Sequence, residues 1–385
     1  MIKNQTTSIS TAAVHAGEPQ PRIGGAVSMP IFQSSTFLYE GETDYHAGRY
    51  VRLNNTPNHE ALHRKLAALE NAEAALVASS GMAAISTSLL AVLRAGDHLL
   101  VVDCPYGGTR GFVTEDLPRW GITHTFIDGD DPADWREKVR PNTRAILVET
   151  ITNPLMQVPD LPAVVEFAAA GNLVSMVDNT FASPVNFRPA ELGFDLSLHS
   201  CTKYLNGHTD LAAGAVIGRA VLVDRIRILL NHLGGTLDPH ACFLLHRGIK
   251  TVVLRVRQQN QSALLIARFL EAHPAVTRVN YPGLESHPAH ERARALFDGF
   301  GGMLSFELAG GVAAADRFLE RVTIPIVAVS LGGVESLAIR PAATAYANVP
   351  RQERERLGVS EGLVRLSVGI EDTDELINDL RAALE

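Results

Sequence analysis

Short apolar runs alternate with longer stretches of helical periodicity along much of the chain. Four such runs, at residues 98–103, 144–150, 172–178 and 212–218, are each too short for a helix and are expected to be buried strands. Strands that alternate with helices are typical of a mostly parallel sheet with helices on both faces. The pattern therefore predicts an α/β fold, in which a ligand binds beyond the carboxyl ends of the strands.

The segments on either side of this alternating region have a different character. Residues 1–53 show no long periodicity and are rich in Gly, Pro and Ser, which predicts an extended arm that packs across a partner subunit. An amphipathic helix is expected at 58–76, and a long helix at 243–274 precedes expected strands at 301–310 and 362–370 and a closing helix. We therefore divide the chain into an arm (1–53), a ligand-binding domain (54–240) and a smaller C-terminal α+β domain (241–385).

Composition narrows the class of protein. The 385 residues carry a net charge of −8, and 46% are hydrophobic against 20% charged, as in globular proteins. No basic cluster favours a nucleic-acid or membrane partner, no apolar run reaches the roughly 18 residues of a membrane span, and the polar N-terminus lacks a signal-peptide core. Three widely separated cysteines, Cys104, Cys201 and Cys242, form no disulfide or metal motif, so we expect a cytoplasmic location.

One lysine stands in unusual surroundings. The segment LHSCTKYLNGHTD (198–210) places Lys203 among small hydroxyl residues, which a lysine that holds an aldehyde cofactor would need. Ser200 and Thr202 are hydroxyl donors of the kind that bind phosphate. Ser80, Gly81 and Met82 precede an expected apolar helix, so that free backbone N–H groups would form a second phosphate cradle. Each signal is weak alone, because such lysines are usually solvated and serine is a common helix cap.

Further polar groups follow the expected strands. Asp178 ends an apolar strand, where an acid must be paired or protonated. It is either a structural cap or ion pair, or a carboxylate that keeps a pyridinium nitrogen protonated and so strengthens an electron sink. Tyr106 is either an ordinary half-buried tyrosine or a ring that lies flat over the same heterocycle. Glu149 and Asn153 follow another strand, so a site is predicted at this edge of the sheet.

The segment SCTKYLNGHTD resembles the lysine signature of the pyridoxal-phosphate enzymes of cysteine and methionine metabolism, a group that includes cystathionine γ-synthase, cystathionine γ-lyase and methionine γ-lyase. The resemblance continues in order through VHAGE, PIFQSSTF, SGMAA, YGGT, ETITNP, DNTF, SLGGVESL and GLVRLSVGIED, from about residue 12 to 385. RYVRLNNTP resembles the family's Tyr-x-Arg-x-x-Asn-Pro-Thr motif, with Thr56 and Pro57 reversed. Within this group we expect the chain to be similar to methionine γ-lyase.

The resemblance implies fold type I of the pyridoxal-phosphate-dependent transferases (aspartate aminotransferase-like) and a cofactor-binding domain at 54–240. It implies that Lys203 forms an imine with the cofactor and then acts as base and acid, and that Tyr106 stacks on the ring and moves protons. Tyr50 and Arg52 would reach the phosphate from a neighbouring subunit in a homotetramer built from dimers that share active sites. The implied cofactor-binding set is Tyr50, Arg52, Gly81, Met82, Tyr106, Asn153, Asp178, Ser200, Thr202 and Lys203. The implied substrate-binding set is Asn153, Ser330 and Arg365, of which Ser330 and Arg365 would bind the α-carboxylate.

The reaction implied is γ-elimination on methionine or on a homocysteine- or cystathionine-type substrate, giving 2-oxobutanoate, ammonia and a thiol. The alternative is γ-replacement of the cystathionine γ-synthase or O-acylhomoserine sulfhydrylase type, which forms a thioether or a thiol amino acid. Val329 stands where cystathionine-using relatives carry an acid, and an apolar wall suits a methylthio group. Those relatives also carry an arginine after YGGT, which Arg110 matches only to within one position.

Several residues depart from the pattern of methionine γ-lyase. Gly108 stands where a cysteine is often found, and Arg340 stands where a histidine is usual. Ala345 and Tyr346 replace a Thr-His pair. This stretch is expected to border the substrate entrance, and Arg340 is a candidate partner for an acidic substrate tail. The departures therefore concern the substrate rather than the cofactor.

A different chemistry is raised by HEALH at 59–63, which matches the H-E-x-x-H motif of zinc peptidases and places His59 and His63 on one helix face. We favour the alternative of an amphipathic helix that carries two histidines, because no third-ligand pattern follows. A binding protein without catalysis is the remaining alternative. The presence together of Lys203, Asp178 and Tyr106 argues against it.

Overall fold

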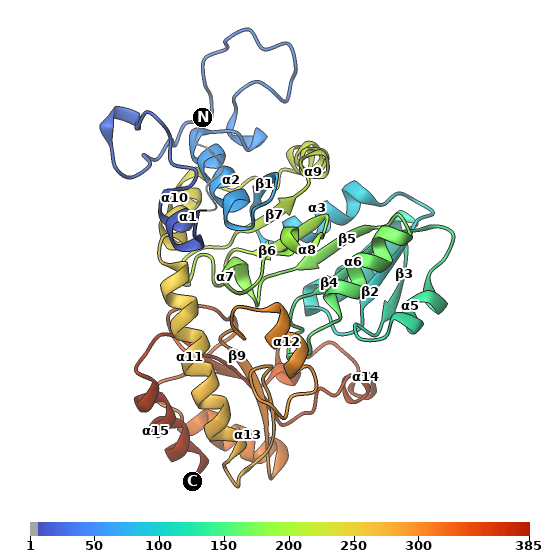
Figure 1. Cartoon of the computed structure of the whole chain (residues 1–385), viewed down its shortest axis with the longest axis vertical. Helices are drawn as coiled ribbons and strands as arrows, with labels where there is room; N and C mark the ends of the chain where they lie inside the picture. Colours follow the sequence, from blue (N-terminus) through green and yellow to red (C-terminus); the bar gives the residue numbers. More distant parts are fainter. Residues whose placement is uncertain (1–6) are drawn as a thin grey trace.

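The computed structural model describes residues 7–385, and two sheets organise this part of the chain (Figure 1). The larger sheet has seven strands in the order β1-β7-β6-β5-β4-β2-β3. Only β7 runs against its neighbours, so the prediction of a mostly parallel sheet is confirmed. Its strands are β1 (Ala74–Ala78), β2 (His98–Val102), β3 (Thr123–Ile127), β4 (Thr143–Glu149), β5 (Val174–Asp178), β6 (Leu196–Ser200) and β7 (Gly214–Gly218).

Helices cover both faces of this sheet, as the alternating pattern predicts. Along β2, Leu99 and Val101 pack into one apolar core with α3 (Gly81–Val92) and α9 (Ala220–Leu233). Leu100 and Val102 point to the opposite face and join α2 (Pro57–Leu69), α6 (Leu161–Ala170) and α10 (Pro239–Ile249). Successive residues of a strand face opposite sides, so a continuous apolar run is what a strand buried on both faces requires. Shorter helices complete this part: α1 (Ile9–His15), α4 (Gly107–Gly111), α5 (Pro132–Lys138), α7 (Ser183–Asn186) and α8 (Pro189–Leu192).

The four strands expected from apolar runs are all present, whereas two helix predictions need correction. The helix expected at 58–76 ends at Leu69, because Asn71 has a left-handed backbone (φ 53°) that turns the chain into β1. The single long helix expected at 243–274 is two helices, α10 and α11 (Val252–Glu271). They are separated at Thr251, which has non-helical angles of φ −111° and ψ 3°.

The smaller sheet has five strands in the order β10-β11-β12-β9-β8, and it confirms the strands expected at 301–310 and 362–370. Leu304, Phe306, Val364 and Leu366 pack against the helices on one face, including the predicted closing helix α15. The opposite face of β12 therefore turns toward the larger sheet. The strands are β8 (Val276–Asn280), β9 (Met303–Leu308), β10 (Ile326–Val327), β11 (Leu337–Ile339) and β12 (Leu363–Ser367), and the helices are α11, α12 (His290–Leu296), α13 (Gly311–Arg321), α14 (Arg351–Arg356) and α15 (Thr373–Leu384).

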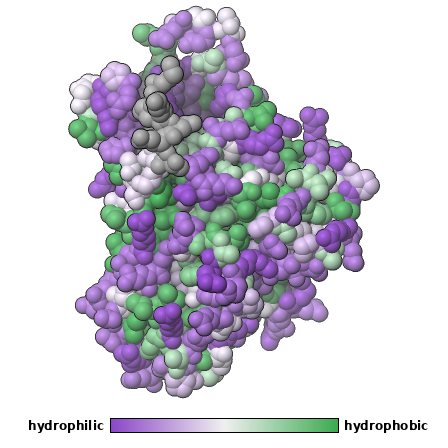
Figure 2. All heavy atoms as spheres, viewed as in Figure 1, coloured by the Kyte–Doolittle hydropathy of each residue, from purple (hydrophilic) through white to green (hydrophobic). Residues whose placement is uncertain are grey.

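The arm projects as long loops from the top of the molecule in Figure 1. Outside α1 it is largely irregular, with one antiparallel bridge between Thr36 and Tyr50. Large apolar side chains of the arm are exposed, among them Val27 at 82% and Leu38 at 88%. Elsewhere, hydrophilic and apolar residues are mixed over the face seen in Figure 2. No helix within residues 7–385 has both the length and the apolar composition needed to cross a membrane.

Candidate active site

A cavity of about 770 Å³ lies where the carboxyl ends of β4, β5 and β6 face the smaller sheet. Ligands of open α/β sheets bind at this edge, so the position agrees with the prediction from the strand pattern. The cavity brings together most of the predicted site residues, although they are spread over nearly 300 positions of sequence. These residues are Gly81, Met82, Tyr106, Asn153, Asp178, Ser200, Thr202, Lys203, Ser330 and Arg365.

An anion cradle forms one end of the cavity, at the start of α3. The Ser80 side chain caps the helix by accepting from the Ala83 N–H at 3.0 Å. The first N–H groups of a helix have no partner within it, and the helix dipole favours a negative charge there. A Cβ on Gly81 would lie 2.8 Å from the Ser200 Cβ, so glycine is needed for this close approach. Thr202 also lines the cavity, with its hydroxyl bonded to the Ala213 backbone.

Two carboxyl groups, buried Glu149 and partly buried Asp178, stand side by side in the cavity wall. Asp178 and Glu149 are paired in register at the ends of β5 and β4. Burial raises the pKa of Asp178, and burial together with the charge of Asp178 raises the pKa of Glu149 well above its usual range. Such a pair is stabilised by a proton or by a cationic group that contacts it. Sequence reasoning placed Glu149 at a strand end without giving it a role; in the structure its Oε1 accepts from the Tyr106 N–H at 2.6 Å.

Lys203 points toward the smaller sheet, and its Nζ donates to the Ser330 Oγ at 2.6 Å. Burial, and to a lesser extent the charge of Arg365, lowers the pKa of Lys203 to about 8. The amine is therefore much closer to its neutral, nucleophilic form at physiological pH than a solvated lysine. Ser330 has a left-handed backbone (φ 93°), a strained conformation for serine that is typical of residues held in place at functional sites.

Arg365 is the cationic group of the opposite wall. Val364 and Leu366 pack against helices, so alternation along β12 turns Arg365 to the face directed at the cavity. Its guanidinium donates to the Asn153 Oδ1 at 3.2 Å and to the Ser330 carbonyl at 2.9 Å. Burial lowers the pKa of Arg365 to about 10, which leaves it charged at neutral pH. A buried, charged fork of this kind is a receptor for a carboxylate.

Tyr106 occupies the turn between the two walls and is 44% exposed. A Cβ on Gly108 would lie 2.7 Å from a ring carbon of Tyr106 and 3.0 Å from the sulfur of Met82. Gly108 is therefore the residue that this ring position requires. The departure from cysteine noted in the sequence accordingly sets where the Tyr106 ring lies.

Tyr50 and Arg52 do not line the cavity of their own chain. The Arg52 guanidinium donates to the Asn231 carbonyl at 2.9 Å and to the Tyr45 hydroxyl, and it lies over the Tyr50 ring at 5.6 Å from the centroid. These contacts order the two residues at the base of the arm.

Two arginines considered for the substrate are engaged elsewhere. Arg340 forms an ion pair with Asp316 at 2.9 Å and donates to the Glu361 carbonyl, so the prediction that it meets an acidic substrate tail is wrong for this arrangement. Arg110 forms an ion pair with Glu353 at 2.6 Å and donates to the Asp103 carbonyl at 3.0 Å. Neither lines the cavity.

The HEALH motif is structural. His59 is fully buried, with one ring nitrogen 2.8 Å from the Thr56 hydroxyl and the other 2.7 Å from the Leu237 carbonyl. Burial lowers the pKa of His59 to about 4 and that of His63 to about 3. No cluster of three potential metal ligands occurs within residues 7–385, so the zinc interpretation finds no support there.

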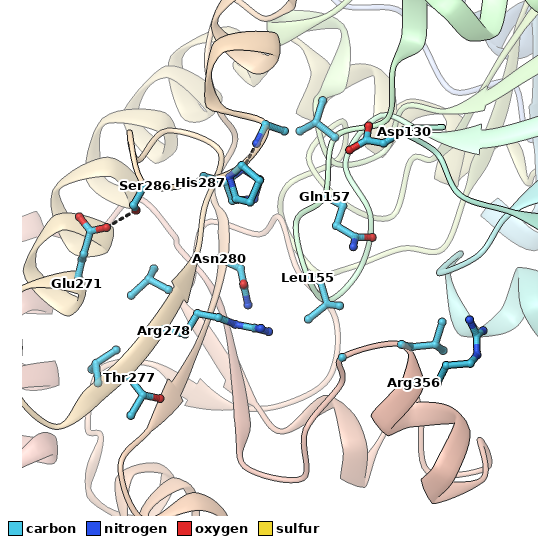
Figure 3. Close-up of a pocket in the computed structure, with 17 residues that line it drawn as sticks. Asp130, Leu155, Gln157, Glu271, Thr277, Arg278, Asn280, Ser286, His287 and Arg356 are labelled. Carbon is cyan, nitrogen blue, oxygen red and sulfur yellow. Dashed lines mark hydrogen bonds between the residues drawn. The ribbon is translucent and has the colours of Figure 1, made fainter. Parts of the chain in front are cut away.

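A second hollow, of about 620 Å³, lies between the two sheets on the other side of the 151–158 segment (Figure 3). Its charged groups already have partners: Asp130 with Arg292, Arg278 with Glu307 at 3.4 Å, and Arg356 with Asp103. Exposed and paired charges of this kind are typical of a solvated groove. The groups whose chemistry the sequence singled out therefore line the first cavity and not this hollow.

The residues present fit pyridoxal 5′-phosphate by their chemistry. The start of α3 with Ser200 suits its phosphate, the acid pair suits its ring nitrogen, and a lysine of lowered pKa suits its aldehyde. The absence of a Cβ at Gly81 lets Ser200 pack directly against the start of α3, which brings its hydroxyl to the anion cradle.

Comparison with known proteins agrees with a site for pyridoxal phosphate. The chain is 42% identical to cystathionine γ-lyase of Bacillus subtilis over 97% of its length and 98% of that protein's, and 40% identical to L-methionine γ-lyase of Fusobacterium nucleatum over the full length of both. The structure superposes on cystathionine γ-lyase of Lactobacillus plantarum in complex with L-serine with a TM-score of 0.93, at 37% identity and 98% coverage of both chains. The family model of Cys/Met metabolism PLP-dependent enzymes matches residues 10–385. The chain therefore belongs to this family of pyridoxal-phosphate-dependent enzymes, as the sequence predicts.

Proposed function

We propose that the protein catalyses γ-elimination on a sulfur amino acid with an uncharged distal group, of which methionine is the model, to give 2-oxobutanoate, ammonia and a thiol. The family establishes an enzyme of the cystathionine and methionine lyase type. The choice of substrate rests on the charges that line the cavity.

One observation carries that choice. Among the described residues, Lys203 and Arg365 are the only lysine and arginine that line the cavity, and cofactor binding and the α-carboxylate would use both. Cystathionine carries a second amine and carboxylate, which need charged partners once they leave water. Arg110 and Arg340 are held by other ion pairs. The remaining wall, with Val329, Thr344 and Ala345, suits a small thioether.

The residues of the chain divide the work between binding and proton transfer. Bound pyridoxal phosphate supplies the electron sink for a carbanion at the substrate Cα. Arg365, steadied by Asn153, holds the α-carboxylate, which fixes the Cα–H bond relative to Lys203. Lys203, with its lowered pKa, takes and returns protons on that side, and Ser330 orients its amine. Tyr106 lines the same cavity, and its hydroxyl is the group proposed to give a proton to the departing sulfur.

A second copy of the chain completes the proposed site. Tyr50 and Arg52 lie outside their own cavity, at the base of an arm that exposes Leu38 and Tyr39 at 88% and 78%. An arm with this much apolar surface is stabilised by docking on another subunit. We therefore propose that Tyr50 and Arg52 reach the phosphate of the neighbouring subunit within a homo-oligomer. An active enzyme that stays monomeric at assay concentration would contradict this arrangement.

The alternative is γ-replacement, in which a second thiol or amino acid attacks the intermediate that elimination would release. The names of the relatives favour lyase chemistry, and the described residues that line the cavity include no lysine or arginine beyond Lys203 and Arg365 to hold the carboxylate of a second amino acid. Replacement therefore has less support than elimination.

The test is an incubation with methionine, cystathionine, homocysteine and O-acylhomoserines at matched concentrations. We expect 2-oxobutanoate and methanethiol from methionine, with a higher kcat/KM than for cystathionine. Pyruvate from cystathionine would indicate β-elimination, and a new thioether would indicate replacement. Either as the main activity would overturn the proposal.

A further inference from the structure

Tyr346 stands directly behind the cavity and is fully buried. It ends a three-residue stretch, here called the roof segment (344–346), whose first two residues line the cavity. The roof segment packs tightly on the turn that follows Tyr106, because a Cβ on Gly107 would lie 2.6 Å from the Ala345 carbonyl oxygen. Tyr346 itself does not line the cavity.

The hydroxyl of Tyr346 joins three segments that are distant in sequence. It donates to the Asn153 carbonyl at 2.7 Å, and the Pro105 carbonyl lies 3.3 Å away. The Cys104 thiol lies 3.2 Å from the same oxygen and can donate to it, which leaves the hydroxyl proton for Asn153. Burial raises the pKa of Tyr346 well above its ordinary value, so this hydroxyl stays a donor throughout the working range of pH.

The partners of this hydroxyl adjoin groups assigned to substrate binding and proton transfer. Asn153 accepts from Arg365 at 3.2 Å through its side chain while its carbonyl accepts from Tyr346. Pro105 immediately precedes Tyr106. Without the Tyr346 hydroxyl, the carbonyls of Asn153 and Pro105 would have only the thiol of Cys104, a weaker donor, beside them. Because an unsatisfied buried carbonyl is costly, we expect the segments that carry these carbonyls to shift.

We propose that Tyr346 is a positioning residue for the reaction: its hydroxyl holds Asn153, and through it Arg365, in a fixed relation to Tyr106. The proposal rests on the role given to Arg365 above, but it does not depend on which distal group the substrate carries.

The test compares Tyr346→Phe with Tyr281→Phe in the cofactor-loaded enzyme. Tyr281 is also fully buried, and its hydroxyl donates to the Gly301 carbonyl at 2.9 Å, away from the cavity. The probe is glycine, which has a carboxylate and an amine but no distal group, and its binding is followed by the visible absorption of the cofactor. We expect the Kd of glycine to rise about tenfold in Tyr346→Phe and less than twofold in Tyr281→Phe. Thermal unfolding of both cofactor-free variants measures the purely structural loss.

Two results would overturn the proposal. Tyr346→Phe could bind glycine as wild type does, or both variants could weaken binding in proportion to their loss of melting temperature. Failure of the wild-type enzyme to act on methionine would instead overturn only the proposed substrate, because glycine reports on the carboxylate site alone.

Discussion

The floor and the roof of the cavity are built in different ways. The floor is formed by strand ends of the larger sheet and the start of α3, with Ser200, Thr202 and Lys203 from one short segment. The roof is formed by residues 329–331, 344–345 and Arg365, which belong to the smaller sheet and its loops. The floor offers an anion cradle, an acid pair and an amine. The roof offers one cation, the hydroxyl groups of Ser330 and Thr344, and the apolar side chains of residues 329, 331 and 345.

This difference separates the two tasks of the site. The groups of the floor match the phosphate, the ring nitrogen and the aldehyde of pyridoxal phosphate. We therefore expect the floor to determine whether the cofactor binds at all. The roof contacts only what the substrate adds, and long-range bonds such as Lys203–Ser330 and Arg365–Asn153 hold it to the floor. Changes in the roof should therefore alter substrate binding while the cofactor remains.

The largest expected effect is the loss of the floor amine. Lys203→Ala should abolish the visible absorption band of the lysine-bound cofactor and reduce turnover at least about 10³-fold, because it removes both the attachment and the proton-transferring group. The protein should still fold, since burial disfavours the charged amine that is removed. Absorption and circular dichroism measure the two properties. A variant that kept the band would exclude Lys203 as the point of attachment.

A substitution in the roof should weaken substrate binding while cofactor binding remains nearly unchanged. Arg365→Ala removes a charged fork that would bind a carboxylate with two bonds, each worth about 1.5–3 kcal/mol. We expect the KM for amino-acid substrates to rise at least about 100-fold. Cofactor affinity, titrated by absorption, should change less than about threefold. Equal losses in the two titrations would show that floor and roof are not separable.

The floor could be predicted from sequence because its chemistry is local. Lys203 lies within three residues of Ser200, and Asp178 ends an apolar run that marks a strand. Parallel strands bring their carboxyl ends to one edge, so topology alone collects these groups. Helix ends were harder to place, since the alanines and leucine of residues 72–76 continue the apolar pattern beyond Asn71, whose left-handed backbone ends α2.

The roof could not be predicted in the same detail, because it depends on tertiary contacts. Arg340 and Arg110 were both plausible substrate partners by position, and only the structure shows the ion pairs that engage them. Tyr346 departs from the family pattern, but its bonds to the Pro105 and Asn153 carbonyls connect segments about 240 and 190 positions apart. Resemblance identified Ser330 and Arg365, which spacing alone would not have found.

Loss of the ion pair between Arg356 and Asp103, here called the clasp, should have a smaller effect on substrate binding. The Arg356 guanidinium binds both oxygens of Asp103 at 2.7 and 2.9 Å, and thereby ties α14 to the loop that leads to Tyr106. Because the pair is partly exposed, Arg356→Ala should raise the substrate KM only about two- to threefold. High salt should raise the substrate KM of the wild-type enzyme by a similar factor and leave the KM of Arg356→Ala unchanged. The control is Arg294→Ala, whose exposed pair with Glu291 is remote from the cavity; an equal effect there would rule out a specific role for the clasp.

The smallest expected effect is a shift in the pH dependence of cofactor uptake by Lys203 when Arg365 of the roof is replaced. Lys203 must be neutral to attack the cofactor aldehyde, so its pKa of about 8 predicts that the rate of cofactor uptake by the cofactor-free protein rises with pH and levels off above about pH 8. A solvated lysine would level off only near pH 10.4. Arg365 contributes to this lowering by charge repulsion, whereas burial is the larger cause. In Arg365→Ala the midpoint should therefore move to higher pH but stay below that of a solvated lysine. Stopped-flow absorption at a series of pH values measures both midpoints. A midpoint that does not move in Arg365→Ala would mean that the charge of Arg365 does not lower the pKa of Lys203.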